Sequence, residues 1–302
     1  NPSMNESSDT PQSDTGDQSR RFLFEHADIR GETVQLDEAY REILAIHQYP
    51  GGVGRLLGEF LAAAVLLSSN LKFEGKLILQ VRSEGQLPLL MVECDDTLQV
   101  RGIARGAEQA TSDNFDLLLH NGQLAVTIDP IRGQRYQGIV PLLQGSLARS
   151  LDYYFEHSEQ LKTRIWLAAD GGRASGLLLQ QLPAQLTQDD AQRREQWDHV
   201  CALATTVKGA ELLTVPCENL VHRLYHEDPV RLFEPTGVRF QCSCSRVRTR
   251  NALSTLGAPE ILELLDEQGS ITMECEFCNQ GYRFERSDLA DVLEGDSGKT
   301  LH

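Results

Sequence analysis

Basic residues are scarce in this 302-residue sequence, which has 28 Lys and Arg against 44 Asp and Glu and a formal net charge of −16. General nucleic-acid binders and proteins that bind anionic membranes need a basic surface to meet phosphates or lipid head groups. Long apolar runs are also missing, because the longest, 60–67, has eight residues and a membrane-spanning helix needs about 18 or more. The composition therefore predicts a soluble protein with no membrane partner and no nucleic-acid partner.

The first twenty residues lack Leu, Ile, Val and aromatic side chains and are rich in Ser, Thr, Asp and Gln. Such a segment cannot bury enough apolar surface to offset the entropy of ordering, so we predict a disordered tail over 1–20. The basic start and apolar middle of a secretory signal peptide are missing as well. We therefore expect a cytoplasmic protein whose seven cysteines are thiols or metal ligands and not a disulfide framework.

Enzyme signatures are also missing. No Gly-x-Ser-x-Gly nucleophile motif occurs. Gly51-Gly52-x-Gly54 precedes an apolar helical stretch but lacks the Gly-Lys-Ser/Thr ending of a phosphate-binding loop, so a flexible turn is the favoured interpretation. His222 and His226 have the spacing of metal ligands on a helix, but the Glu and third ligand of a zinc protease are missing. We predict no enzyme activity.

Residues 21–183 contain both segments with the alternation typical of strands and segments with the spacing typical of helices. Alternating apolar residues predict antiparallel strands, and helical spacing predicts helices between them. The expected strands include 77–81, 98–100, 124–128, 163–168 and 174–180. The expected helices are 38–46, 55–67 and 146–161. Because the strands and isolated helices follow no repeating βαβ rhythm, we predict an N-terminal α+β domain of mixed sheets and helices.

Residues 184–235 are rich in Gln, Asp, Glu and Arg, and two amphipathic helices are expected there. The first covers 189–207, and the second begins near Pro216, a residue favoured at a helix start. Their narrow apolar stripes need a partner surface. Two interpretations stay open: ordinary helices packed on the N-terminal domain, or a linker that folds only conditionally. The stripe residues that are candidates for docking or for binding a partner are Trp197, Val200, Leu220, Leu224 and Tyr225.

Residues 236–294 are the last unit that we expect to fold, and a tail follows over 295–302. A strand leads into each of two cysteine pairs, helices are expected at 245–256 and 259–267, and a final helix opens at Ser287. About sixty residues make only a small core, so this unit needs a staple such as a metal ion.

Four of the seven cysteines form the two pairs, Cys242-Ser-Cys244 and Cys275-Glu-Phe-Cys278. Four thiolates about 2.3 Å from one ion form the tetrahedral site that zinc prefers. We therefore predict one Zn²⁺ per chain, bound by all four cysteines in the reduced state. The other three, Cys94, Cys201 and Cys217, lie on apolar stripes and are expected to be inert core residues.

This site has two candidate roles. It can be a purely structural knot in a constitutive binding module for protein or nucleic acid. In a nucleic-acid binder, the phosphates would be contacted by Arg246, Arg248 and Arg250. Residues 236–294 contain ten acidic residues against six Arg, however, so a solvated face is favoured for these arginines. It can instead be a switch, since thiolates react with oxidants and each pair can close into a disulfide. Loss of the metal would then unfold the small unit and free the two helices, which we expect to lie next to it.

From Phe22 to about Glu294 the sequence resembles the redox-regulated heat-shock chaperone family known as the 33 kDa chaperonin. The resemblance rests on Tyr154-Phe155 with Ser158-Glu159-Gln160, on Gly176-Leu177-Leu178-Leu179-Gln180, on Leu220 to Glu227 with Arg223-Leu224-Tyr225-His226, and on Cys242-x-Cys244 with Cys275-x-x-Cys278. The cysteine pattern matches that of the family position by position.

The resemblance implies an ATP-independent holdase that is inactive when it is reduced and zinc-bound. It implies a chaperone core over 21–183, a metastable helical linker over 184–235 and a zinc-binding redox switch over 236–294. Oxidation would form the disulfides Cys242–Cys244 and Cys275–Cys278, release zinc and unfold the linker. The active form would be a homodimer that binds unfolded or partly folded client proteins under oxidative stress.

Overall fold

The computed structural model describes residues 16–69, 74–142 and 145–295. Sheet A is built from β1 (Gln18–Phe24), β2 (Ile29–Leu36), β8 (Thr163–Ala169), β9 (Ala174–Gln181), β10 (Val230–Leu232) and β11 (Thr236–Gly237). Sheet B is built from β3 (Gly75–Arg82), β4 (Leu89–Asp95), β5 (Gln99–Arg105), β6 (Gln123–Pro130), β7 (Tyr136–Pro141) and β12 (Arg239–Phe240). A separate hairpin pairs β13 (Ile271–Glu274) with β14 (Gly281–Phe284).

The strand order is β10-β1-β2-β9-β8 in sheet A, with β11 also beside β1, and β12-β5-β4-β3-β6-β7 in sheet B. The helices of the N-terminal domain are α1 (Glu38–Ile46), α2 (Gly51–Ser68), α3 (Phe115–Leu118) and α4 (Leu147–His157). Strands and helices follow one another without a βαβ rhythm, so the predicted α+β fold class is confirmed.

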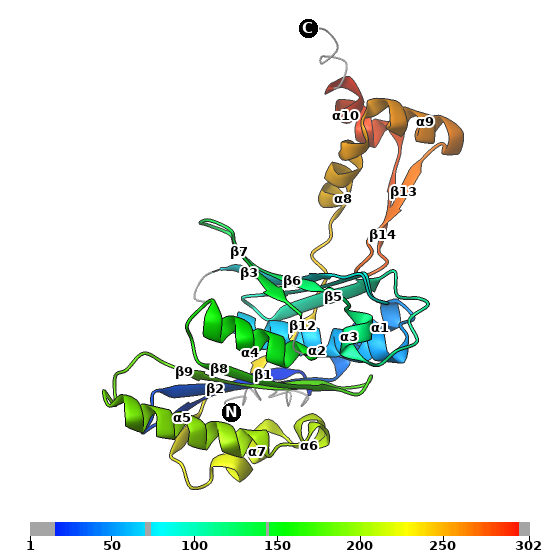
Figure 1. Cartoon of the computed structure of the whole chain (residues 1–302). Helices are drawn as coiled ribbons and strands as arrows, with labels where there is room; N and C mark the ends of the chain where they lie inside the picture. Colours follow the sequence, from blue (N-terminus) through cyan, green and yellow to red (C-terminus); the bar gives the residue numbers. More distant parts are fainter. Residues whose placement is uncertain (1–15, 70–73, 143–144, 296–302) are drawn as a thin grey trace, which may run out of the picture.

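Helix α2 is the centre of the N-terminal domain. It lies between the two sheets and contacts β2, β8 and β9 on one side and β3, β4 and β5 on the other (Figure 1). Its length and composition would suffice to cross a membrane, but 83% of the helix is buried inside the protein. Burial on all sides therefore explains why α2 is apolar all round.

The second face of sheet A is covered by α5 (Asp190–Thr205), α6 (Gly209–Thr214) and α7 (Cys217–Tyr225), below the sheet in Figure 1. A cluster of apolar side chains separate from the α2 core joins these helices to β1, β2 and β9. The predicted helices at 189–207 and from 216 are confirmed, and α6 between them was not predicted. Its six residues are too few to show a periodic stripe.

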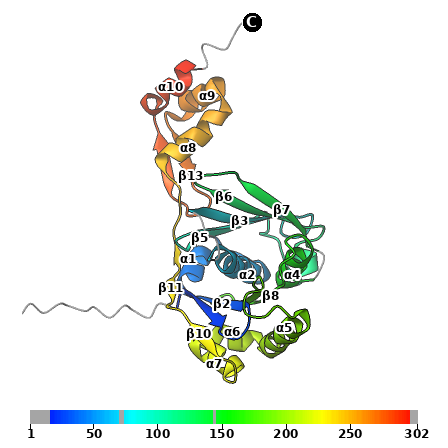
Figure 2. The ribbon, with the colours of Figure 1, turned by 90° about the vertical axis from the view of Figure 1, so that its left-hand side faces the viewer.

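After α7 the chain runs back along one edge of both sheets (Figure 2). We call residues 229–241, which include β10, β11 and β12, the strap. Beyond the strap lies a C-terminal module of α8 (Arg246–Leu253), η1 (Ser254–Leu256), α9 (Ala258–Gln268), the β13–β14 hairpin, η2 (Arg286–Leu289) and α10 (Ala290–Gly295). Its apolar core has six buried side chains: Leu253, Ile261, Leu265, Ile271, Phe284 and Leu289. A core of this size is small for an independent fold.

The N-terminal boundary predicted at residue 20 is wrong. Strand β1 begins at Gln18, and the buried Asp17 carboxylate accepts a hydrogen bond from the Ala39 backbone N–H at 2.8 Å, at the start of α1. Backbone pairing with β2 orders these polar residues although they carry no apolar pattern. The rest of the predicted N-terminal tail, 1–15, and the tail 296–302 lie outside the described residues.

Within the N-terminal domain, the helix at 38–46 and the strands at 163–168 and 174–180 are confirmed to within a residue. Two helix boundaries are wrong, because α2 begins at Gly51 and α4 ends at His157. Gly51, Gly52 and Gly54 therefore form the first turn of α2, where we expected a flexible turn before it. Tertiary packing overrides the low helix propensity of glycine at the buried positions Gly52 and Gly54, whereas Gly51 is exposed.

A glycine inside α2 sets how closely the helix approaches its neighbours. A Cβ atom at Gly58 would lie 2.6 Å from Tyr40 Cζ and 2.9 Å from Ala169 Cβ. We expect Gly58→Ala to lower the free energy of unfolding by about 1–3 kcal/mol, because overpacking outweighs the better helix propensity. Gly51→Ala in the same helix, where the nearest atom is Arg55 Nη1 at 3.4 Å, should leave stability unchanged or slightly raised. Equal thermal unfolding midpoints for both variants would contradict this close packing.

Candidate metal centre

Two short segments bring four cysteines together, and we call them the cysteine cluster: Cys242, Cys244, Cys275 and Cys278. The first pair lies in the extended segment between β12 and α8, whose N-cap is Ser245. The second pair lies in the tight turn between β13 and β14. In that turn the backbone N–H groups of Cys278 and Asn279 both donate to the Cys275 carbonyl, at 3.2 and 2.7 Å. Asn279 has φ of +57°, a left-handed conformation that Asn tolerates, and it reverses the chain.

The four Sγ atoms all lie within 4.8 Å of one another. Sγ of Cys242 is 3.7 Å from that of Cys275, and Sγ of Cys244 is 3.5 Å from that of Cys278. Ligands at 2.3 Å in a tetrahedron are about 3.8 Å apart, so these separations match four thiolates around one zinc ion. Among the residues that the structure describes, no other group of three or more His, Cys, Asp or Glu converges in this way.

Arg101 of β5 lies beside the cysteine cluster. Its Nη1 is 3.5 Å from Cys242 Sγ, and its guanidinium lies 4.1 Å from the centroid of the Phe277 ring. Burial raises the pKa of the Cys242 thiol, but hydrogen bonds from the Cys244 backbone N–H and from Arg101 outweigh it and hold that pKa below its ordinary value. Glu93, which is buried, orients the guanidinium at 2.8 Å. Arg101 thus favours the thiolate form that a metal requires.

Polar contacts attach the turn that carries Cys275 and Cys278 to the end of α1 and to β5. Asn279 Nδ2 donates to the Ile46 carbonyl at 2.9 Å, and His47 Nε2 lies 2.6 Å from the Glu276 carbonyl oxygen. The Glu276 carboxylate pairs with Arg105 at 2.7 Å. Most of these groups are exposed, so each contact contributes little by itself. The β13–β14 turn, which holds the second cysteine pair, is therefore a part of the C-terminal module that meets the N-terminal domain.

The C-terminal module and helices α5–α7 lie on opposite sides of the N-terminal domain (Figure 1). The expectation that the module lies next to these helices is therefore wrong. Adjacent positions in sequence do not become neighbours in space here, because the strap carries the chain along the edges of both sheets before it reaches Cys242.

The predicted stripe residues pack on sheet A. Trp197, Val200, Leu220 and Tyr225 are buried, and Leu224 is half-buried against the same cluster. The Tyr225 ring meets Phe24 edge-on at 4.8 Å, and its hydroxyl donates to the Val200 carbonyl at 3.0 Å. These side chains lie far from the cysteine cluster and dock the helices on the sheet. Whether any of them binds a client stays a prediction.

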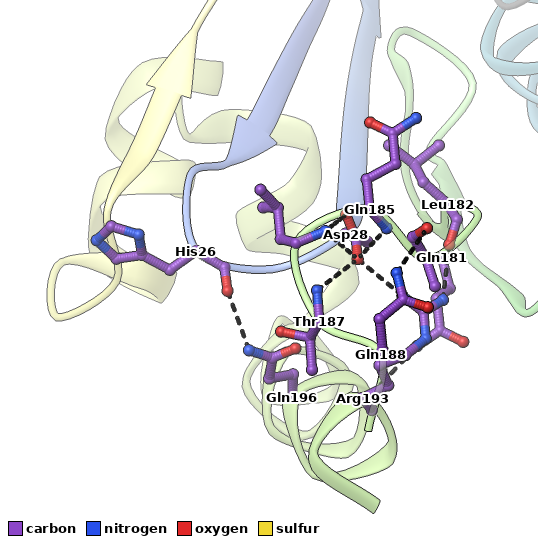
Figure 3. A network of polar contacts seen from close by, with 11 residues as sticks. His26, Asp28, Gln181, Leu182, Gln185, Thr187, Gln188, Arg193 and Gln196 are labelled. Atoms are coloured by element: carbon purple, nitrogen blue, oxygen red, sulfur yellow. Dashed lines mark hydrogen bonds and ion pairs between the residues drawn. The ribbon is translucent and has the colours of Figure 1, made fainter. Parts of the chain in front are cut away.

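Asp28, in the turn between β1 and β2, holds the chain just before α5 (Figure 3). Its carboxylate accepts hydrogen bonds from the backbone N–H groups of Gln185 at 3.0 Å and Leu186 at 3.1 Å, and from the Arg193 guanidinium at 2.8 Å. Burial raises the pKa of Asp28, but the backbone donors and Arg193 outweigh it, so the pKa lies below its ordinary value. We call this network the Asp28 latch.

Neighbouring bonds extend the Asp28 latch. Arg193 Nη2 donates to the Leu182 carbonyl at 2.7 Å, and Gln196 Nε2 of α5 donates to the His26 carbonyl at 3.0 Å. Neither Asp28 nor Arg101 is marked by a pattern in the sequence. A single Asp in a turn and a single Arg in a strand belong to no motif, and only the fold brings their partners to them.

The remaining sequence motifs have structural explanations. Gly52 is needed because a Cβ there would lie 2.3 Å from the Ser112 carbonyl oxygen, so a loop closes over the start of α2. Arg246 and Arg250 pair with Asp288 and Asp291, which agrees with the predicted solvated face. The scattered cysteines Cys94 and Cys217 are buried and Cys201 is half-buried, and burial raises the pKa of all three thiols.

Known proteins are similar to this chain in sequence and in fold. A family model described as Hsp33 protein matches residues 17–285. The 33 kDa chaperonin of Pseudomonas paraeruginosa is 53% identical over 282 residues, which are 92% of this chain and 95% of the relative. Those of Pseudomonas aeruginosa and Azotobacter vinelandii are 54% and 52% identical over equal shares.

A solved structure extends the likeness to the fold. The crystal structure of a 33 kDa chaperonin (heat shock protein 33 homologue) from Thermotoga maritima has a TM-score of 0.79 at 21% identity, over 93% of this chain and 99% of that one. At this identity the solved structure supports the fold alone. The family model and the close relatives together show that the chain belongs to the Hsp33 family.

Proposed function

We propose that this protein is a redox-regulated, ATP-independent chaperone that holds unfolding proteins under oxidative stress in the cytoplasm. The observation that carries the proposal is the cysteine cluster, whose four sulfur atoms lie within reach of one ion at the base of a module with a small core. The names of the close relatives support a chaperone. The acidic composition supports protein clients and not nucleic acid.

A zinc ion bound by Cys242, Cys244, Cys275 and Cys278 would hold them as thiolates and cross-link the two segments that carry them. Arg101 stabilises the negative charge on Cys242 from outside the site. The protein is inactive in this reduced state, because helices α5–α7 cover the apolar face of sheet A.

Oxidation would convert the four thiolates into two disulfides. In each sequence pair, Cys242 with Cys244 and Cys275 with Cys278, two thiolates give two electrons to one peroxide molecule and an S–S bond forms. The peroxide takes up two protons and leaves as two water molecules. Once two disulfides exist, no thiolate remains to hold zinc, and the metal is released.

The domain boundaries predicted from the sequence complete the proposal. With the N-terminal boundary moved to include Asp17 and β1, residues 17–183 are the chaperone core, 184–235 the metastable linker and 236–294 the redox switch. Release of zinc unfolds the switch and then the linker, which uncovers apolar side chains around Trp197 and Tyr225 and on sheet A for clients and for a second copy of the chain. The oxidised protein is then a homodimer.

Light scattering of a heat-unfolded client tests the regulation. Protein oxidised by peroxide at mild heat, with zinc released, should suppress aggregation at near-stoichiometric amounts, and reduced zinc-bound protein should not. Equal suppression by both forms would favour the constitutive binding module with a structural knot. Suppression by neither form would remove the chaperone proposal for this chain.

The ligand set is tested with Cys278→Ser. Because three thiolates leave the tetrahedron incomplete, zinc affinity should fall by more than the about 10–100-fold typical of changes outside the ligand shell. Cys201→Ser, which alters a half-buried thiol on α5, serves as the control and should leave affinity unchanged. Zinc stoichiometry and competition with a chelating dye measure both variants. Unchanged binding by Cys278→Ser would remove this residue from the ligands.

The Asp28 latch is tested with Asp28→Ala, which leaves the largely buried Arg193 guanidinium without its partner. Linker docking should weaken by about 3 kcal/mol, seen as about 100-fold faster hydrogen exchange of the α5 amides. Glu227→Ala, at an exposed site, is the control. Because the folded pKa of Asp28 lies below the unfolded value of about 3.9, the latch should be intact at neutral pH and be lost as the pH falls through that folded pKa. Unchanged α5 exchange in Asp28→Ala would contradict this role.

A further inference from the structure

The strap covers an edge of each sheet. Its strand β10 pairs antiparallel with β1 through Phe22–Leu232, Leu23–Arg231 and Phe24–Val230, and β11 continues along β1. Farther on, β12 pairs parallel with β5. The far side of β1 is occupied by β2. Without the strap, β1 and β5 would become edge strands with unpaired backbone groups, which is the usual template for pairing with another chain.

The backbone groups of β1 that face the strap can be identified. The Phe233 N–H donates to the Arg21 carbonyl and the Glu25 N–H donates to the Pro229 carbonyl, both at 2.9 Å. Hydrogen-bonded pairs alternate along an antiparallel ladder, so Leu23 and Arg231, between these two pairs, also bond to each other. The backbone N–H and C=O groups of the odd-numbered residues of β1 therefore point toward the strap, and those of the even-numbered residues point toward β2.

The strap is held weakly along its length and more firmly at its ends. Nine of its thirteen residues are exposed, and only Val238 is buried. One end continues from Tyr225, which is buried against Phe24, and the other end leads to Cys242 in the cysteine cluster. Few buried contacts mean a low free energy of local opening. Loss of the anchor at Cys242 therefore favours release of the strap.

The edge beneath the strap suits a particular kind of segment. Val230 and Leu232 point into the apolar cluster on sheet A, while Arg231 between them is exposed. Strand addition recognises the backbone of a peptide, and pockets for alternate side chains add specificity. The site therefore fits an extended segment with apolar residues at every second position, whatever its exact sequence. Unfolded proteins expose such segments.

We propose that the edge of β1, once the strap has left it, binds an extended segment of an unfolded client by adding it as a new strand of sheet A. This inference deepens the proposed chaperone function and rests on it. The strap occupies this edge in the resting protein, so it acts as an internal competitor of the client. Phe22 and Phe24, which α7 covers at rest, provide apolar contacts beside the new strand.

Residue-resolved hydrogen exchange of the full chain tests the inference, with reduced and carboxymethylated α-lactalbumin as the unfolded client because it has no free thiol. The Leu23 and Glu25 N–H groups should be protected in the reduced protein and exchange at least about tenfold faster after oxidation. They should regain protection when the client is added. The Arg20 and Phe22 N–H groups face β2 and should stay protected throughout, as an internal control.

Two outcomes of this experiment would overturn the inference while leaving the chaperone function intact. In one, the oxidised protein suppresses aggregation but Leu23 regains no protection with client. In the other, the strap is released by oxidation but the Leu23 N–H is protected again before any client is added, which would mean that a second copy of the chain fills the edge. Failure of the oxidised protein to suppress aggregation at all would instead remove the proposed function, and the inference with it.

Arg231→Pro opens the edge without oxidation, because proline has no N–H to donate to the Leu23 carbonyl. In the reduced, zinc-bound protein this variant should speed exchange at Leu23 at least about tenfold and bind the unfolded client. Arg231→Ala loses the same side chain but keeps the N–H, so it should behave like the unaltered protein. Equal exchange at Leu23 in both variants would overturn the role of the strap, and circular dichroism would verify that both variants fold.

Discussion

Convergence of four sulfur atoms on one point is the constraint on which the arrangement of the C-terminal module depends. The module has a core of six buried side chains. Its contacts with the N-terminal domain are exposed polar pairs around Glu276 and the half-buried contacts of Arg101 with Phe277 and Cys242. Such pairs contribute little in water, and a small core scarcely offsets the entropy of ordering the chain. A metal ion bound by the four cysteines would cross-link the two segments and supply what packing does not, and the same cross-link would fix the end of the strap at Cys242.

The cysteine cluster lies far from helices α5–α7. The helices that cover sheet A lie on one side of the N-terminal domain and the cluster lies on the other, so a change at the sulfur atoms cannot reach the helices by direct contact. The strap is the covalent connection between them, and it pairs with β5 and then with β1 on the way. Because short strands with few buried side chains open easily, a strap freed at one end can detach stepwise toward α7. Under the proposed function, detachment of this edge strand would be the physical connection between the cysteine cluster and the helices.

Periodicity and spacing predicted those parts of the molecule that depend on local sequence. The helix at 38–46 and the metal-ligand spacing of the four cysteines are local patterns, and the structure has both. The start of strand β1, Gln18-Ser-Arg-Arg, could not be predicted because it has no apolar pattern. It is ordered by backbone pairing with β2 and the strap. The position of the C-terminal module was predicted wrongly for the same kind of reason. Sequence neighbours were assumed to be spatial neighbours, and only long-range pairing of the strap separates them.

Helices α5–α7 are attached in a way that would suit the release that the proposed function requires. Helix α5 buries three of its sixteen residues, and a charged pair between Asp28 and Arg193 fixes the chain at its start. A buried ion pair costs almost as much in desolvation as it gains in attraction, so it defines one docked position without adding much net stability. Apolar side chains of similar volume would hold the linker more tightly, and the helices would then stay on sheet A after the strap had gone. A polar latch therefore keeps the docked state unique and leaves its lifetime dependent on the anchors at its two ends.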